Sequence, residues 1–424
     1  MTTFIEKAKL VLQDPALRRR IIFTLLALAF FRLLSAIPIP GADSAALARF
    51  FASNQVFGLI NLFSGGGLST LSIVMLGVGP YINASIIMQL LSMVFDNLKK
   101  MYQEEGEIGR RKFSQYTRFL SVPLAALQAW GFIVLLEKQG ALSTLSSFDL
   151  VVSVIVATAG SVLLMWIGEL ISEFGIGNGT SLIIFAGIVA AIPTGIAQSI
   201  YSYDPSKIPF YAAFVVIALV VILGVVFITE AERPVPVTYA KRVRGNRVFG
   251  GISTYIPLRL NQAGVIPIIF ALSLLLFPQM ILQFLSTGAS FPALKGIADT
   301  LLTLLANPWV YAALYFLLVF IFTYFYTAVT FDPKNIADNL QKNGAFVPGV
   351  RPGMATAEYI GKIITRITMV GAVFLGLIAV LPQIMRGVSG VSSLAIGGTA
   401  LLIVVSVVID LVKKIDAQIS MREY

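Results

Sequence analysis

Residues 57–95 read FGLINLFSGGGLSTLSIVMLGVGPYINASIIMQLLSMVF, and the rest of the chain is interpreted around this stretch. It begins as a short apolar helix pattern, breaks at SGGG (64–67), and resumes as an apolar run of membrane-spanning length. That run contains a Gly-Val-Gly-Pro step at 77–80 and the polar residues Asn83, Ser85 and Gln89. A broken helix is tolerated at membrane depth only where it is packed in protein or lines a cavity. The stretch therefore predicts part of a pathway rather than a lipid-facing wall.

The composition indicates a polytopic membrane protein. Of the 424 residues, 57% are hydrophobic and 12% are charged, which is about half the charged fraction of a soluble protein. The chain has no Cys and no His, which excludes disulfides, thiolate chemistry and His-based metal sites. We therefore expect no metal and no cofactor.

Ten apolar segments have the length of a membrane span, so the predicted fold is an all-α polytopic membrane protein with ten transmembrane helices. They are residues 20–37, 73–95, 118–136, 150–170, 180–200, 209–229, 264–285, 308–329, 361–382 and 394–412.

The basic residues predict the orientation of these spans. Of the 31 lysines and arginines, 25 fall in one alternating set of connectors and five in the opposite set, with Arg32 inside the first span. By the positive-inside rule, the basic connectors and both termini face the cytoplasm, which requires an even number of spans.

Five spans precede the connector at 201–208 and five follow it, which predicts two pseudo-symmetric halves of inverted topology. The predicted halves are residues 1–200 and 201–412, followed by a short cytoplasmic tail at 413–424. Two basic cytoplasmic loops, 230–263 and 331–360, are longer than topology requires. Such loops can present guanidinium groups to acidic partners or to RNA phosphates.

Ionisable residues are scarce in the spans, which bears on the class of function. Apart from Arg32, they are Glu169, Glu173 and Asp410, and each of these three can reach an interface, so helix-end pairing is the favoured interpretation. No protease constellation and no nucleotide-binding loop is present, so an enzyme is not expected. Two classes stay open: a passive conduit driven by a partner, and an ion-coupled secondary transporter that uses backbone carbonyls at broken helices.

The chain resembles the SecY family of protein-conducting channels over essentially its whole length. The motifs that carry the resemblance are LSIVMLGVGPYINASIIMQLL (71–91), EGEIGRRKFSQYTR (105–118), WIGELISEFGIGNGTSLIIFAGIVA (166–190), YAKR (239–242), NQAGVIPIIFA (261–271), PKNIADNLQKNGAFVPGVRPG (333–353) and GGTALLIVVSVVID (397–410). The resemblance implies an hourglass channel that passes unfolded preproteins between the two halves. It also implies a multi-pass protein of the bacterial cytoplasmic membrane.

The resemblance assigns roles to several positions in the channel. A central ring of aliphatic side chains falls on Val78, Ile82, Ile184, Ile269 and Ile403. A re-entrant plug helix falls on about 58–70, and its candidate residues are Leu62, Phe63, Ser64, Gly65, Gly66 and Gly67. Gln128 and Asn261 match the lateral gate, through which hydrophobic segments leave into lipid.

The resemblance also implies partners. They are the small subunits SecE and SecG, the SecA motor ATPase, the ribosome, preproteins with their signal peptides, and membrane lipids. The docking residues implied by the motifs are Lys241, Arg242, Arg244, Arg247 and Arg351. Pro234 and Pro236 depart from the family pattern near the start of the first long loop, which leaves its local geometry open.

Overall fold

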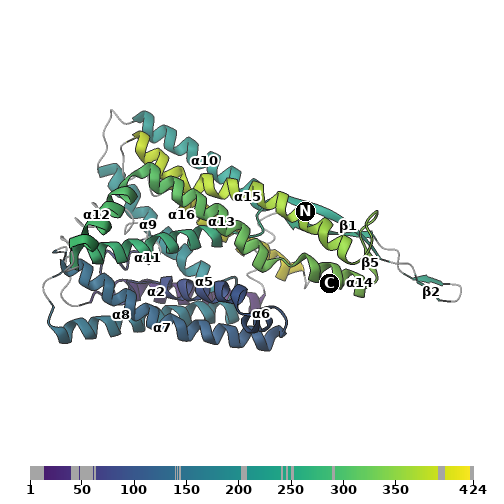
Figure 1. Ribbon diagram of the computed structural model, residues 1–424, viewed down its shortest axis with the longest axis horizontal. Coiled ribbons are helices and arrows are strands. Elements are labelled where there is room, and N and C mark those ends of the chain that lie inside the picture. The colour runs from purple at the N-terminus through teal and green to yellow at the C-terminus, as the bar shows by residue number, and fades with distance from the viewer. Residues whose placement is uncertain are drawn as a thin grey trace. The chain divides into compact units, whose positions relative to one another are not determined.

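The computed structural model of the chain is mostly helical (Figure 1). It describes residues 14–39, 47, 61, 64–138, 140, 142, 145–201, 208–239, 242–244, 247–249, 253–288, 292–389 and 397–420. The chain divides into two compact units, each described by itself below. Unit 1 comprises Met1–Pro209, Ser273–Asn307 and Val407–Tyr424, and unit 2 comprises Phe210–Leu272 and Pro308–Ser406.

The helices of unit 1 include four that pack alongside one another, α2, α5, α7 and α8 (Figure 1). Their bounds are Pro15–Ser35 (α2), Gly79–Val94 (α5), Gly106–Lys138 (α7) and Ser147–Phe174 (α8), with α6 at Asp96–Gln103, α9 at Gly179–Tyr201 and α12 at Pro292–Ala306. Asp14 caps α2 by accepting a hydrogen bond from the Ala16 amide, and Pro15 occupies the first turn, where its missing N–H is not needed.

Unit 2 contains α13 and α15, which pack along each other (Figure 1). Its helices are α10 (Ile208–Glu230), α13 (Pro308–Thr330), α14 (Pro333–Lys342) and α15 (Met354–Ser389), and its strands are β1 (Glu232–Tyr239), β2 (Arg242–Arg244), β3 (Arg247–Phe249), β4 (Ser253–Arg259) and β5 (Ala345–Phe346). Two more helices, α11 (Ile266–Gly288) and α16 (Gly397–Ser420), are divided between the units, and α10 has its first two residues in unit 1.

Each of the ten predicted spans overlaps one helix of the structure, and these helices differ in length. Among the described residues, four helices are long and apolar enough to cross a membrane, namely α7, α8, α13 and α15. Shorter apolar helical stretches lie at 179–193, 215–230 and 266–275. The prediction of a mostly helical membrane protein is confirmed at this level.

The second predicted span begins later than its hydropathy indicates. Residues 73–78 are not helical, and α5 begins only at Gly79. Gly77 has a φ of 58°, in the left-handed region, and Pro80 can begin a helix but cannot extend one backwards. The apolar run therefore enters as irregular backbone before it becomes a helix.

The two long loops contain strands, which a purely helical prediction omits. β1 pairs with β4 and β5 in an antiparallel sheet of order β4-β1-β5, named here the loop sheet, while β2 and β3 form a separate hairpin. Val235 and Val237 of β1 pack with Leu258 of β4 and with Ile360 and Ile364 of α15. The N-terminal part of α15 thus serves as the platform for the sheet.

The prolines of β1 fit this sheet because of its register. Pro234 lies opposite Pro257 of β4, and neither can donate an amide hydrogen. That pair must therefore be of the non-hydrogen-bonded type, which leaves Arg233, Val235 and Val237 to bond with β4. The other edge of β1 pairs with β5 only at Thr238 and Tyr239. At Pro234 and Pro236 that edge has no partner strand, so the amide hydrogens that the prolines lack are not needed there.

Candidate functional site

The candidate site is Ser64–Val78, named here the broken segment, which is the irregular chain directly before α5. It consists of consecutive turns. Gly65 and Gly66 have φ values of 67° and 83°, and both lie in the left-handed region that glycine adopts without steric cost. A Cβ on Gly65 would lie 2.6 Å from Cζ of Phe31 and 3.3 Å from Cα of Gly187. Only glycine fits this turn.

Backbone hydrogen bonds fasten the broken segment to the chain that follows α2. The Ile39 amide donates to the Leu71 carbonyl at 2.8 Å, and the Ile73 amide donates to the Ile37 carbonyl at 3.0 Å. Thr70 Oγ1 adds a bond to the Ser35 carbonyl at 3.1 Å. These bonds satisfy backbone groups that irregular chain leaves without helical partners.

The broken segment also lies directly on α8. A Cβ on Gly160 would lie 1.9 Å from the Ile73 carbonyl oxygen, so any larger residue there displaces the segment. The adjacent Ser161 hydroxyl donates to the Gly77 carbonyl at 2.9 Å. Close backbone approach and a serine hydrogen bond together replace the helical bonds that the glycine-proline step removes.

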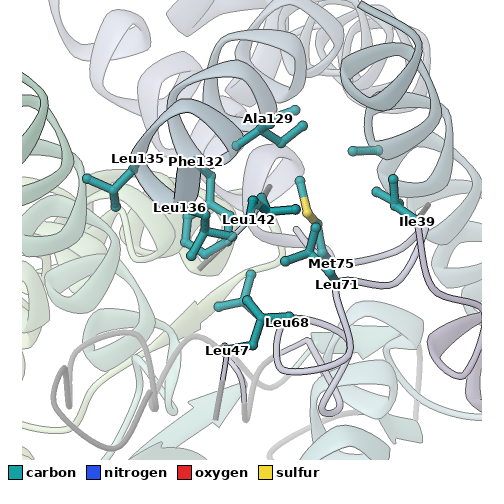
Figure 2. Close-up of a cluster of buried hydrophobic side chains, with 12 residues drawn as sticks. Ile39, Leu47, Leu68, Leu71, Met75, Ala129, Phe132, Leu135, Leu136 and Leu142 are labelled. Atoms are coloured by element: carbon teal, nitrogen blue, oxygen red, sulfur yellow. The ribbon is translucent and has the colours of Figure 1, made fainter. Parts of the chain in front are cut away.

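An apolar core holds the later part of the broken segment (Figure 2). Leu68, Leu71 and Met75 are buried against Phe132 and Leu136 of α7. The remaining members of this core include Ile39, Ala129, Ile133, Leu135, Leu142 and Ala157. Ser64–Gly67 contribute no side chain to it, so the segment divides into a turn at 64–67 and an anchored part from Leu68 onward.

Arg32 has its partner in the turn. Its Nη1 donates to the Gly65 carbonyl, and the same atom lies 3.5 Å from Ser35 Oγ. A Cβ on Gly66 would lie 3.7 Å from that nitrogen, so the guanidinium rests against the double-glycine turn. The sequence placed Arg32 in a span without naming a partner, because a backbone carbonyl leaves no signature in side-chain chemistry.

The predicted ring positions are distributed over both units. Val78, Ile184 and Ile403 are buried, and Ile82 and Ile269 are partly exposed. Val78 is the residue that precedes α5, and its carbonyl accepts the first helical bond from the Ile82 amide at 3.1 Å. The expected spacing of four residues is thus retained, although Val78 lies at the helix end rather than inside it.

The predicted plug and gate residues are described in part. Leu62 and Phe63 lie outside the described residues, while Ser64–Gly67 form the turn. Gln128 is buried on α7 in unit 1. Asn261 is buried in unit 2, where its Cα would lie 3.9 Å from a Cβ on Gly371 of α15. Within the described residues, Asn261 Oδ1 has no hydrogen-bond partner.

The described docking residues lie in the β2–β3 hairpin and in the turn before α15, outside the loop sheet. Arg242, Arg244 and Arg247 are in the β2–β3 hairpin, and Lys241 lies outside the described residues. Arg351 has an exposed side chain in the turn before α15, and its carbonyl accepts a bond from Thr356 Oγ1 at 2.9 Å. Gly349 and Gly353 flank it with φ values of 81° and 95°, which shape the turn that presents the guanidinium.

Of the other three ionisable groups of the spans, Glu169 and Asp410 form ion pairs, and Glu173 is exposed near the end of α8. Glu169 Oε1 of α8 lies 2.7 Å from Arg118 Nε of α7, and Asp410 Oδ2 lies 2.9 Å from Lys414 Nζ one turn along α16. These two contacts support structural roles for both carboxylates. They leave Arg32 as the ionisable span residue that contacts the broken segment.

Comparison with known proteins decides between the function classes that the sequence left open. A sequence model described as SecY matches residues 72–412. The protein translocase subunit SecY of Corynebacterium glutamicum is 44% identical over 431 residues, which cover 97% of each chain. The chain belongs to the SecY family. Membership in a family of translocase subunits does not support the alternatives of a secondary transporter or an intramembrane enzyme.

Solved SecY-type structures share the fold. One describes the SecY plug domain as stabilising the closed state of the translocation channel and maintaining a membrane seal, and it superposes with a TM-score of 0.68 at 21% identity, covering 100% of this chain and 98% of that one. Another is canine Sec61 in a ribosome-channel complex, with a TM-score of 0.66 at 20% identity and the same coverage. Both likenesses extend over the full length of the SecY-family fold.

Proposed function

We propose that the chain is the channel-forming subunit of a Sec translocon in a bacterial cytoplasmic membrane, with both termini in the cytoplasm. It passes unfolded preproteins through a pathway between two inverted halves of five spans. The observation that carries the proposal is the broken segment, since irregular backbone at membrane depth is stable only in protein or along a cavity. Family membership over 97% of the chain supports polypeptide as the cargo.

The constriction of this pathway is a ring formed by Val78, Ile82, Ile184, Ile269 and Ile403. Compact aliphatic side chains offer no hydrogen bonds to a sliding peptide, and a narrow dry ring resists ion leak. Val78 is the last residue of the broken segment and Ile82 lies in the first turn of α5, which supports placing the ring where α5 begins.

The plug ends at the turn Ser64–Gly67, which acts as its hinge. The prediction from sequence extends the plug to residue 70, but Leu68 is buried in the apolar core of unit 1. Moving Leu68 into water would cost about 1.5–3 kcal/mol. Glycines in the left-handed region can change conformation at less cost, so motion is expected up to Gly67 and not beyond it.

The lateral gate is the seam to which Gln128 and Asn261 contribute. The unpartnered Oδ1 of Asn261 supports this role, because a buried amide oxygen favours a hydrogen-bond donor across a helix seam. Such bonds contribute about 0.6 kcal/mol each in membranes. A hydrophobic signal segment can therefore displace them and enter lipid.

Energy for transport comes from partners, the SecA ATPase or the ribosome, which dock on the two cytoplasmic loops. The exposed Arg351 and the basic β2–β3 hairpin, together with Lys241, supply guanidinium and ammonium groups that suit acidic surfaces or RNA phosphates. SecE holds the two halves together, and SecG is a third component of the complex. The canine Sec61 structure in a ribosome-channel complex supports the ribosome as one partner.

The test is site-specific crosslinking of a stalled preprotein. Ile82→Cys and Ile269→Cys provide single thiols in a chain that has no native Cys. Both should crosslink to the preprotein, while Leu223→Cys, on an exposed apolar position of α10, should not. Absence of crosslinks at 82 and 269, with the preprotein shown by protease protection to be stalled in transit, would refute the proposed pathway.

A further inference from the structure

The pairing of Arg32 with the turn Ser64–Gly67 extends beyond the residues assigned above. The guanidinium contacts the turn at the Gly65 carbonyl, three residues before the anchored part begins at Leu68. In this contact the guanidinium binds a backbone carbonyl and no side chain of the turn. The contact therefore depends on the backbone conformation of the turn.

The geometry of the turn allows residues of α2 to hold it in place. Two consecutive glycines in the left-handed region direct the Gly65 carbonyl toward Arg32. Inside the turn, the Ser64 hydroxyl accepts from the Leu68 amide at 3.1 Å and donates to the Asn61 carbonyl at 3.1 Å. These bonds are local, so the Arg32 contact and the Phe31 ring are what tie the turn to α2.

An arginine within a span also has a physical reason to keep this contact. A guanidinium at membrane depth is costly unless it is paired with a backbone carbonyl, another polar group or water. The Arg32 side chain is otherwise exposed on its unit, so its protein partners there are the Gly65 carbonyl and Ser35. Leaving the turn would remove the closer of these partners, because Ser35 Oγ lies 3.5 Å from Nη1, at the limit of a hydrogen bond.

We propose that Arg32 is the positioning residue that latches the turn Ser64–Gly67 in the resting channel. The latch rests on the proposed function only in assigning the turn to a gated pathway; the contact itself is a property of unit 1. Loss of the guanidinium removes a charge-assisted hydrogen bond, which shifts the turn toward open forms roughly 10- to 100-fold.

The test is the rate at which a water-soluble maleimide modifies a thiol at Ser64. Ser64 is 1% exposed, and the chain has no native Cys, so Ser64→Cys reports opening of the turn without background. In resting membrane vesicles, adding Arg32→Gln should raise its rate of modification roughly 10- to 100-fold. Arg19→Gln, at an exposed arginine of the same helix, should leave the rate unchanged.

A second thiol distinguishes local opening of the turn from a general loss of packing in unit 1. Ser121→Cys lies buried on α7, away from the turn, and its rate should not change with Arg32→Gln. An unchanged rate at Ser64→Cys, or an equal rise at Ser121→Cys, would overturn the proposal. Arg32→Met, which keeps an unbranched stem suited to a membrane span, is judged by the same criteria if Arg32→Gln does not accumulate.

Preprotein transport is measured in parallel, in vesicles of the same kind that contain the unmodified chain. Transport with no effect of Arg32→Gln on Ser64→Cys refutes the latch alone. A faster Ser64→Cys reaction in vesicles that carry out no transport supports the latch and counts against the proposed function.

Discussion

The broken segment and the loop sheet both interrupt a mostly helical chain, and different interactions hold them. The loop sheet is held along its length by strand register and by an apolar contact with α15. The broken segment is held by an apolar core only from Leu68 onward, while its turn at Ser64–Gly67 is held by single hydrogen bonds and a guanidinium. The loop sheet is therefore suited to rigid presentation of its side chains. The broken segment is suited to a fixed anchored part from Leu68 onward and a mobile turn at Ser64–Gly67.

The largest expected effect is on the loop-sheet side. Arg351→Glu reverses an exposed charge that a rigid turn presents, so ATP-driven preprotein transport should fall about tenfold or more through charge repulsion with the partner. Insertion of the channel in the membrane should be unchanged. Lys342→Glu, an exposed basic residue at the end of α14, is the matched control and should have a smaller effect. Normal transport by Arg351→Glu would remove the docking role.

The next effect concerns the anchored part of the broken segment. Gly160→Ala forces a Cβ to 1.9 Å from the Ile73 carbonyl oxygen, so either α8 or the segment must move. We expect a loss of about 3 kcal/mol in the free energy of unfolding, measured in detergent. Gly131→Ala on α7, where a Cβ meets nothing within 4 Å, should be neutral or stabilising. Equal stabilities of the two variants would contradict the close contact.

A smaller effect is expected when the sheet core is reduced. Val237→Ala removes two methyl groups from a side chain that is 1% exposed, which should cost about 2 kcal/mol of local stability. Limited proteolysis within residues 232–259 should become faster, while the rate of maleimide modification at Ser64→Cys stays constant. Val220→Ala, on an exposed position of α10, should change neither measurement. A change at Ser64 would show that the two regions are coupled.

The sequence predicted the interruptions well because they depend on local chemistry. Glycines at 65, 66 and 77 and Pro80 act on their own backbone, so both breaks could be located without a structure. The long apolar helices followed from hydropathy for the same reason. The late start of α5 was missed because residues 73–78 are as apolar as the helix that follows, and hydropathy does not distinguish a buried turn from a span.

Contacts between distant residues could not be predicted from the sequence. Gly160 and Ser161 looked like ordinary residues of an apolar helix, yet they hold Ile73 and Gly77. Arg32 bonds to a carbonyl 33 residues away, and no side-chain pattern encodes that partner. The loop sheet was missed because Pro234 and Pro236 argue against a strand until the opposite Pro257 and the unpaired edge are seen.

The most direct measurement compares two buried serines of the broken segment during transport. Ser64→Cys reports the turn, and Ser72→Cys, at a residue that is 0% exposed, reports the anchored part. With a preprotein stalled in the channel, maleimide should modify Ser64→Cys at least about tenfold faster than at rest, and Ser72→Cys should stay protected. Protection at both sites, or exposure of Ser72→Cys, would contradict a broken segment with a fixed anchored part and a mobile turn at Ser64–Gly67.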